Sequence, residues 1–361
     1  MPIVEIKKDN HVDFKNTLPG VPHVESPFFN QFFSPDNCDT ELLRISRDLN
    51  ENGFVVIDFP DKDFDRKAEL IKNSLRGKYD WDKWHSTGYE SGNGMRIQDA
   101  WEFDENVRSI AINQVVIDLI SRLYGRKAQP FQSLNFPVGT QQHFHSDAIH
   151  FSSIPERFMC GVWVALEDIS EDAGPLEYYP GSHKWPIYTN EHIGLNASLL
   201  ENKPTQELYE PMWRSLIEAH GLKKQTFTAK KGQALIWAAN LLHGGGKQKS
   251  SSKTRWSQVT HYYFENCAYY SPLRSDPFFG SIDFKNVTDM VTRRKVANQY
   301  LGNHIPQDFV KLTDPKLKRN AIPGEFDPYL YLLKNPDVKA AGLDAWEHYS
   351  QFGWREGRPI R

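Results

Sequence analysis

The amino-acid sequence predicts an α+β fold in which helices precede a block of short strands closed into a sandwich or barrel. Apolar residues recur at helical spacing in several segments before Gly125. Between about Pro130 and Glu265 the pattern changes to short apolar runs punctuated by Gly, Pro and Asn, which is typical of strands. A chain of 361 residues is long enough for one large domain with additions, or for two smaller domains.

The part before Gly125 is expected to hold three helices and one strand. Asp39 or Thr40 can cap the first helix, and Gly53 ends it because glycine adopts the left-handed conformation without strain. The expected elements are helices at about 40–50, 64–75 and 106–124 and a strand at 54–59. The first thirty-odd residues are expected to form a surface arm, and residues 77–100 an irregular loop over a site.

The β block is expected to contain seven short strands and one helical insert. The insert covers about Thr205 to Ala219. The expected strands are Phe131–Phe136, Gln142–His145, Phe158–Leu166, Leu176–Tyr179, Lys224–Thr228, Ala234–Trp237 and Trp256–Phe264.

The C-terminal part differs in composition and follows a break at Pro323-Gly324. Residues 1–322 are expected to form the main domain, with a core at about 40–270, and residues 325–361 a small helical hairpin. Its two helices are expected at about Pro328–Lys334 and Leu343–Phe352, joined near Asn335-Pro336.

Charge and cysteine content narrow the functional class. Lys and Arg total 43 and Asp and Glu 46, so the net charge is close to zero. Overall charge therefore does not favour binding to nucleic acid or to an anionic membrane. The three cysteines, with no CxxC pair, do not form a disulfide framework and suit a reducing compartment. The N-terminus lacks the apolar run of a signal peptide, and no stretch is apolar enough to span a bilayer. A cytoplasmic location is therefore expected.

One tripeptide and one distant histidine indicate a metal site. His145 and Asp147 are two residues apart, so on a strand both side chains would point to one side. Two histidines and a carboxylate form the facial ligand set of non-haem Fe(II) oxygenases, which leaves three positions open. His243 is the best candidate for the third ligand, because it follows an apolar run and precedes Gly244-Gly245-Gly246, where backbones can approach closely.

A carboxylate clamp is expected a dozen residues after His243. The planar fork of Arg255 can hold a carboxylate through two parallel hydrogen bonds, and the hydroxyl of Ser257 can add a third. The two residues would share one face of a strand by the same period of two.

The segment from Gly174 to Lys184, GPLEYYPGSHK, resembles the G-P-L-x-x-x-P-G-S-H signature of the phytanoyl-CoA dioxygenase family. The run Trp163–Asp168 resembles the strand that precedes the signature in that family, and the resemblance covers about residues 40–270. It implies a double-stranded β-helix (jelly-roll) core flanked by N-terminal helices. It also implies Fe(II), 2-oxoglutarate and O₂ as cofactor and co-substrates, with ascorbate as a supporting reductant.

The resemblance also assigns roles by position. His145, Asp147 and His243 match the iron ligands, and Arg255 with Ser257 matches the clamp on 2-oxoglutarate. Trp163 and Gln132 sit where the family lines the co-substrate pocket, and His183 belongs to the signature turn with a structural role. The implied reaction is hydroxylation of an unactivated C–H bond with release of succinate and CO₂. Halogenating relatives have a small residue at the position of Asp147, so hydroxylation is favoured here.

The substrate and the partners of the tail stay open. Residues 77–104 and 186–222 are the best placed to shape a pocket for a saccharide or lipid-linked sugar, an amino-acid-like metabolite or an acyl thioester. The tail motifs Asn335-Pro336-Asp337-Val338, His348-Tyr349 and 353–358 are similar to a short bacterial module appended to glycan-assembly and other envelope-associated proteins. The tail is therefore expected either to dock on such a partner or to cap the main domain.

Two other functional classes remain as alternatives. His143 and His145 form an H-x-H pair like that of cupins, with another metal and no 2-oxoglutarate, although the residues after Asp147 lack the expected acid. A non-catalytic binding protein on the same fold would show a broken ligand set, and none is visible. An esterase is disfavoured because the chain has no G-x-S-x-G nucleophile elbow beside the His243 glycines.

Overall fold

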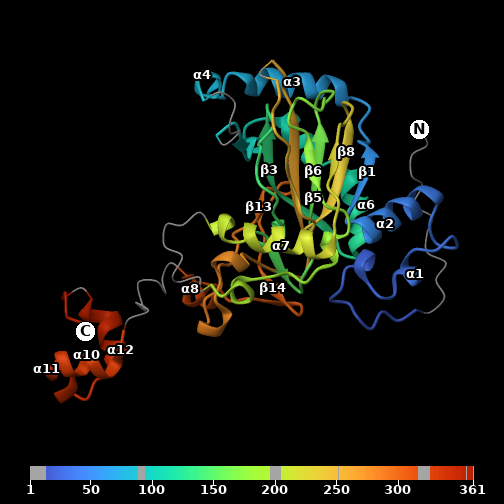
Figure 1. The fold of residues 1–361 in the computed structure, drawn as a ribbon. Coiled ribbons are helices and arrows are strands. Elements are labelled where there is room, and N and C mark those ends of the chain that lie inside the picture. Colours follow the sequence, from blue (N-terminus) through green and yellow to red (C-terminus); the bar gives the residue numbers. More distant parts are fainter. Residues whose placement is uncertain are drawn as a thin grey trace.

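Two antiparallel β-sheets that face one another form the centre of the protein (Figure 1). The computed structural model describes residues 14–87, 94–195, 205–250, 252–315, 326–354 and 356–360. The larger sheet has the spatial order β1 (Phe54–Asp58), β8 (Gln233–Ala238), β5 (Met159–Ala165), β10 (Ser257–Phe264), β3 (Ala128–Phe136) and β2 (Ile97–Gln98). The smaller sheet has the order β7 (Gln225–Phe227), β6 (Leu176–Tyr178) and β9 (His243–Gly245). The core is therefore the double-stranded β-helix that the sequence predicts.

Each central strand of the larger sheet is buried on both faces. All seven residues of β5 are buried. Val162 and Val164 belong to the core shared with the helices, whereas Trp163 and Ala165 belong to the core between the two sheets. Because successive side chains on a strand point to opposite faces, this alternation explains a continuous apolar run. The inner face therefore supplies the side chains of any site between the sheets.

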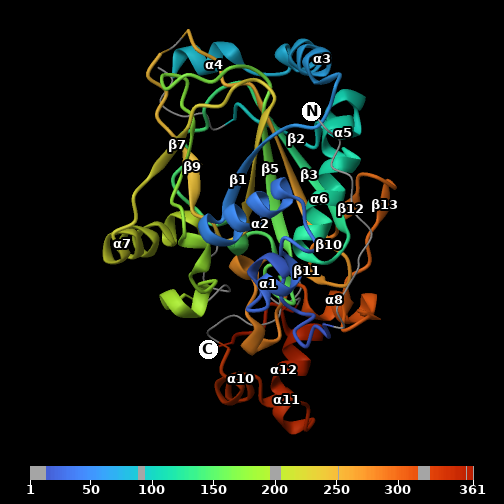
Figure 2. The same ribbon diagram turned by 90° about the vertical axis from the view of Figure 1, so that its right-hand side faces the viewer.

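Helices cover the outer face of the larger sheet. They are α2 (Thr40–Asn52), α3 (Phe64–Arg76), α5 (Glu105–Ala111) and α6 (Gln114–Tyr124), and all four contribute to the same buried cluster. Figure 2 shows α5 and α6 on the side of this sheet away from β7 and β9. The Asp39 side chain caps α2 by accepting from the Leu42 N–H, and Gly53 ends α2 with φ 82°.

Several boundaries differ from the sequence prediction. The single helix expected at 106–124 is broken at Asn113, whose side chain accepts from the Val116 N–H and so starts α6. The region 77–100 is not only loop, because it contains α4 (Trp81–Ser86) and β2, and residues 88–93 lie outside the described chain. The expected strand 142–145 is absent: His145 forms only an isolated bridge.

The expected surface arm is also wrong for residues 23–33. These form η1 (His23–Glu25) and α1 (Phe29–Phe32), and Val24 is fully buried. The Glu25 carboxylate pairs with Arg157 at 2.7 Å. Apolar side chains of this segment thus belong to the main core.

The remaining elements surround this centre. One small sheet pairs β4 (Ser152–Ile154) with β11 (Ala268–Tyr270), and the helical insert is η7 (Thr205–Leu208) followed by α7 (Glu210–His220). Two hairpins and a helix follow β11: β12 (Thr288–Asp289) with β13 (Arg294–Lys295), β14 (Gln299–Tyr300) with β15 (Asn303–His304), and α8 (Gln307–Thr313). Among the described residues, no helix is both long and apolar enough to cross a membrane.

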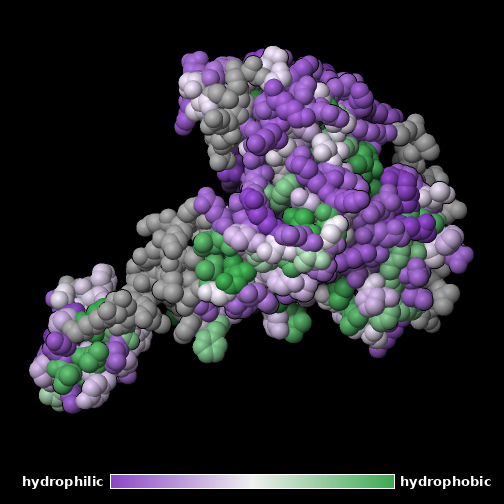
Figure 3. Space-filling view, in the orientation of Figure 1, coloured by the Kyte–Doolittle hydropathy of each residue, from purple (hydrophilic) through white to green (hydrophobic). Residues whose placement is uncertain are grey.

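The C-terminal helices pack on one another. They are α10 (Pro328–Lys334), α11 (Pro336–Ala340), α12 (Ala345–His348) and the π-helical turn Tyr349–Gly353. The first helix is as predicted, but Pro336 starts an additional one. Tyr331, Val338 and Ala345 form a small buried cluster. Figure 1 shows this part beside the main body, and Figure 3 shows hydrophobic surface on it.

We propose that residues 326–360 are a structural unit separate from the main domain. The expected break at Pro323-Gly324 lies outside the described residues. The buried hydrophobic cluster of residues 326–360 shares no residue with the three hydrophobic clusters of the main body. The docking of the tail on a partner protein stays a prediction.

A chain ended after Pro315 is therefore expected to keep its fold. Its melting temperature should move by less than about 4 °C, which corresponds to about 1 kcal/mol for a domain of this size. Differential scanning calorimetry of the full and shortened chains measures the shift. A drop of about 10 °C or more, or aggregation of the shortened chain, would show that the tail is part of the main fold.

Candidate metal centre

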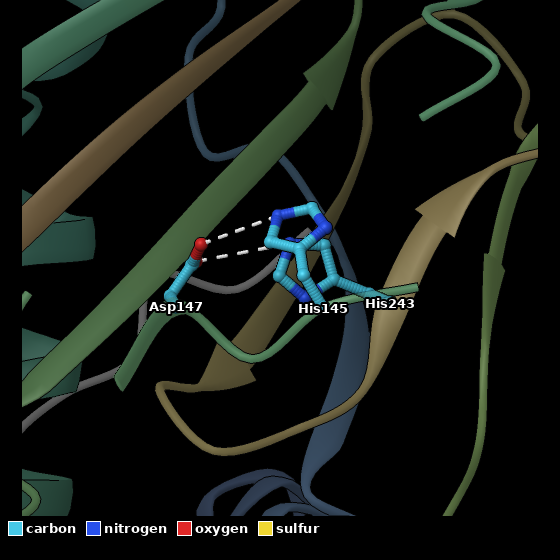
Figure 4. Close-up of side chains that lie close together, drawn as sticks. All are labelled: His145, Asp147 and His243. Atoms are coloured by element: carbon cyan, nitrogen blue, oxygen red, sulfur yellow. Dashed lines mark ion pairs between the residues drawn. The ribbon is translucent and has the colours of Figure 1, made fainter. Parts of the chain in front are cut away.

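Three buried side chains converge between the two sheets (Figure 4). The ligand atoms of His145, Asp147 and His243 all lie within 4.8 Å of one another. The distance from His145 Nε2 to Asp147 Oδ1 is 3.6 Å, and that from His243 Nε2 to Asp147 Oδ2 is 3.7 Å. This is the only such group of His, Cys, Asp and Glu among the described residues. The structure therefore brings together the three residues that the sequence pattern selected.

Backbone pairing, rather than a regular strand, produces the convergence. His145 and His243 form an isolated antiparallel bridge with N–H to O=C distances of 3.0 and 3.1 Å. Asp147 then begins a short 3₁₀ turn that the Ser146 side chain caps. The three side chains thus converge as expected, but the expectation that His145 and Asp147 share one strand face is wrong.

The glycines after His243 let the two chain segments meet. A Cβ on Gly244 would lie 2.7 Å from the Gln142 carbonyl oxygen, and one on Gly245 would lie 2.7 Å from the Gln141 nitrogen. Since real Cβ atoms do not approach this closely, larger residues would force the bridge apart. These glycines are required for close approach, as the sequence predicts.

Both imidazoles are oriented for metal binding. The Nδ1 of His145 lies 3.0 Å from the His143 carbonyl oxygen, and the Nδ1 of His243 lies 3.0 Å from the Leu241 carbonyl oxygen. Because a carbonyl only accepts, each Nδ1 carries the hydrogen, and each Nε2 presents its lone pair to the site. Burial lowers the pKa of His243 to about 4, so its ring is neutral at neutral pH, as a ligand must be.

The carboxylate of Asp147 is held in its charged form. Burial alone raises its pKa, but the neighbouring histidines, with His243 first, outweigh burial and lower it. The Trp237 indole donates a hydrogen bond to Asp147 Oδ2 at 2.9 Å. Two neutral imidazoles and one carboxylate on a shared face are the donor set that Fe(II) takes in non-haem oxygenases, and these residues fit that ion.

A second feature is a buried cation without a counter-ion. Arg255 is only 2% exposed, and its Nη1 donates to the Gly174 carbonyl at 3.1 Å. No carboxylate in the described part of the chain pairs with Arg255, and burial lowers its pKa to about 10. Within the same part, Arg255 Nε, Ser257 Oγ and Trp163 Nε1 are buried without hydrogen-bond partners. Such orphaned donors indicate the place of an anionic ligand.

The strand register relates this cation to the histidines. Ser257, Val259 and His261 of β10 alternate with residues of the outer face, and Val259 pairs with Trp163 of β5. His261 Nε2 lies 3.7 Å from Asp147 Oδ2. Ser257 and His261 are four residues apart, or about 13 Å at 3.3 Å per residue. The orphaned donors near Ser257 and the triad beside His261 therefore lie along the same inner face of β10.

Gln132 lies near the histidines. It pairs with His261 across β3 and β10, and its Oε1 is 2.9 Å from His261 Nδ1. His261 is 4% exposed, and burial lowers its pKa. Sequence reasoning missed His261, although it continues the two-residue alternation that begins at Ser257.

Two other histidines lie outside the triad. His143 Nε2 faces Glu210 of α7 at 3.7 Å, and its Nδ1 lies 2.9 Å from the Phe144 carbonyl oxygen. His183 Nε2 lies 3.0 Å from the Asn50 carbonyl oxygen at the end of α2. The buried His183 ring packs over Gly53, where a Cβ would collide with it. His183 thus ties the signature turn to the N-terminal helices.

The two facing sheets and the set of two histidines and one carboxylate define the class as jelly-roll proteins with a candidate mononuclear metal centre. The family model described as phytanoyl-CoA dioxygenase (PhyH) matches residues 23–256. The chain belongs to the phytanoyl-CoA dioxygenase family.

The relatives that match this chain have low sequence identity to it. The peroxisomal phytanoyl-CoA dioxygenase of Bos taurus is 24% identical over 140 residues, which cover 36% of this chain and 36% of the bovine protein. The probable alpha-ketoglutarate-dependent hypophosphite dioxygenase of Stutzerimonas stutzeri is 21% identical over 166 residues, covering 45% of this chain and 54% of the relative. The chain thus spans between a third and somewhat over half of the length of these relatives.

Solved structures with a similar chain path also have low sequence identity to this protein. The carbocyclase SnoK from nogalamycin biosynthesis has a TM-score of 0.48 at 17% identity, covering 65% of this chain and 87% of SnoK. EctD from S. alaskensis with 2-oxoglutarate and 5-hydroxyectoine has a TM-score of 0.45 at 16% identity, covering 83% of this chain and 86% of EctD.

Replacing His145 or His243 with Ala is expected to abolish stoichiometric Fe(II) binding, because two protein ligands do not hold the ion on one face. Anaerobic equilibrium dialysis measures the bound iron. The exposed His304 provides the control, and His304→Ala should bind about one Fe(II) per chain like the parent protein. Stoichiometric binding by the His243→Ala protein would contradict the assignment.

Gly161→Ala is expected to weaken iron binding from a position outside the ligand set. A Cβ at Gly161 would collide with the indole of Trp237, which donates to Asp147. Loss of such a supporting hydrogen bond typically lowers metal affinity about 10–100-fold. Titration of the anaerobic protein with Fe(II) measures the change. Gly77→Ala, at a position open to solvent, is the matched control and should leave the affinity unchanged.

Proposed function

We propose that this protein is an Fe(II)- and 2-oxoglutarate-dependent dioxygenase that hydroxylates an unactivated C–H bond of a small-molecule substrate. The observation that carries the proposal is the buried Arg255 guanidinium, which lacks a carboxylate partner among the described residues. A cation in this state is stabilised by a bound carboxylate far more than by water. The distal carboxylate of 2-oxoglutarate would form this ion pair with Arg255.

The chain's own residues divide the work between three tasks. His145, Asp147 and His243 would hold Fe(II) on one face. Arg255 would bind the distal carboxylate, with Ser257 Oγ and Trp163 Nε1 as further donors. When bound, Fe(II) with 2-oxoglutarate and O₂ supplies the oxidant for the C–H bond and releases succinate and CO₂. The apolar side chains between the two sheets exclude water from this space.

The contacts of His143 count against a cupin-like centre. A cupin would use His143 and His145 as a ligand pair, but His143 lies beside Glu210 and Phe144. Asp147, which lies with His145 and His243, would instead complete the ligand set. With Asp147 in place, no protein position is left for a halide, which supports hydroxylation over halogenation.

Succinate release tests the proposal directly. The protein is loaded with Fe(II) without oxygen, mixed with 2-oxoglutarate and exposed to air, and succinate is measured. The parent protein should release succinate, and the His243→Ala protein should not. The absence of 2-oxoglutarate turnover in the iron-loaded parent protein, with every tested substrate class, would refute the proposed function.

Arg255→Ala is expected to weaken 2-oxoglutarate binding at least tenfold while Fe(II) still binds. A hydrogen bond to a charged group contributes about 1.5–3 kcal/mol, and each 1.4 kcal/mol is a factor of ten. The visible charge-transfer absorption of the anaerobic Fe(II) complex follows the binding. Arg214→Ala, an exposed arginine on α7, is the control. An unchanged affinity in the Arg255→Ala protein would remove Arg255 from the co-substrate site.

A further inference from the structure

His261 stands beside the three proposed iron ligands but is not one of their group. Its Nε2 lies 3.7 Å from Asp147 Oδ2, yet its ligand atoms do not lie within 4.8 Å of the whole triad. His261 is buried on the inner face of β10. It therefore faces the space in which the reaction would take place.

The tautomer of His261 leaves an acceptor directed at this space. Gln132 Oε1 lies 2.9 Å from His261 Nδ1, and an amide oxygen only accepts. The hydrogen is therefore on Nδ1, and the lone pair is on Nε2.

Asp147 cannot satisfy this lone pair. At 3.7 Å the contact is longer than a hydrogen bond, and both the ionised carboxylate and Nε2 are acceptors. Asp147 Oδ2 already accepts from the Trp237 indole at 2.9 Å. No hydrogen-bond donor to His261 Nε2 is found in the described part of the chain. Nε2 is not one of the fully buried side-chain atoms without a partner, so it borders space in which a donor on a ligand can meet it.

Aromatic rings flank this acceptor. The His261 ring lies 5.2 Å from Phe151 and 6.1 Å from Phe131, and these two phenyl rings are 5.7 Å apart. The co-substrate clamp lies in the other direction along β10, at Ser257. The end of the site that remains for the primary substrate thus has aromatic walls with His261 Nε2 between them. His150 lies 6.2 Å from Phe151 and 6.5 Å from His145, and Lys285 Nζ lies 5.6 Å from the Phe151 ring, so this end also carries polar groups.

We propose that His261 Nε2 accepts a hydrogen bond from a hydroxyl or amine of the primary substrate, close to the carbon that is oxidised. This inference rests on the proposed function. The substrate class is then a small molecule that combines such a donor with an apolar face, as in saccharides, cyclitols and amino alcohols. An acyl thioester presents only a carbonyl acceptor near its oxidised carbons and would leave Nε2 unmatched. Gln132 acts as a positioning residue, because it fixes the tautomer.

The experiment compares substrates and variants in the full-length, iron-loaded protein. The probes are glucose, myo-inositol, serine and ethanolamine, their deoxy or deamino analogues, and butanoyl and hexadecanoyl coenzyme A. Compound-dependent succinate release is measured for each. We expect a donor-bearing compound to give the largest stimulation.

The variants separate a substrate contact from a structural role. His261→Leu is expected to lower kcat/KM for that compound at least tenfold, and to make little difference for the matching analogue that lacks the donor. His261→Asn retains an acceptor and should recover part of the loss, and Gln132→Leu should give an intermediate loss. Thr260 pairs with Val162, whose side chain belongs to the core under the helices, so it lies on the opposite face of the strand from His261. Thr260→Val is the matched control and should behave like the parent.

Three results would overturn the inference. The first is loss of Fe(II) binding in the His261→Leu protein, which would make His261 a fourth ligand. The second is an equal loss for compounds with and without the donor. The third is stimulation by acyl thioesters alone, or by none of the donor-bearing compounds. Binding of Fe(II) and 2-oxoglutarate by the parent protein, followed by charge-transfer absorption, tests the proposed function separately, so the two failures are distinguishable.

Discussion

The backbone bridge between His145 and His243 is the interaction on which the site depends. It joins two segments that lie far apart in the sequence and places both imidazoles on one side of Asp147. The bridge tolerates no Cβ at Gly244, so the glycines after His243 are part of the metal site although they carry no ligand atom. The fold of the β block therefore serves mainly to hold this one pairing in place.

The charge distribution between the sheets opposes stability and favours ligand binding. A guanidinium buried without a counter-ion is costly, and a carboxylate bound beside it removes that cost. Any ligand that binds only the folded state also stabilises it. On the proposed function, the unpaired donors of Arg255, Ser257 and Trp163 are the energetic cost of a site organised in advance for a dicarboxylate. Replacing Arg255 with a neutral residue would remove the free-energy cost of the buried charge, and it would also abolish the affinity for the carboxylate ligand.

The sequence predicted which side chains converge better than it predicted the backbone that positions them. His145, Asp147 and His243 could be selected because few residue types bind iron and their order is restrictive. The strand at 142–145 was wrong, because a period of two does not distinguish a strand from a bridge followed by a turn. The helix break at Asn113 was missed for a similar reason, since apolar spacing continues across it. His261 belongs to no motif, and only the register of β3 against β10 reveals its contact with Gln132.

On the proposed function, one strand carries both the co-substrate clamp and the substrate contact. The inner face of β10 runs from Ser257 at the co-substrate clamp, past Val259, to His261 at the substrate end. Cross-strand neighbours such as His261 and Gln132 can change together without moving the bridge that holds the ligands. On that proposal, His261 and Gln132 would contribute to substrate choice, whereas Fe(II) and 2-oxoglutarate would be bound by other residues. A polar pair at this position, where an apolar pair would pack as well against Phe131 and Phe151, is the reason to assign a donor to the substrate.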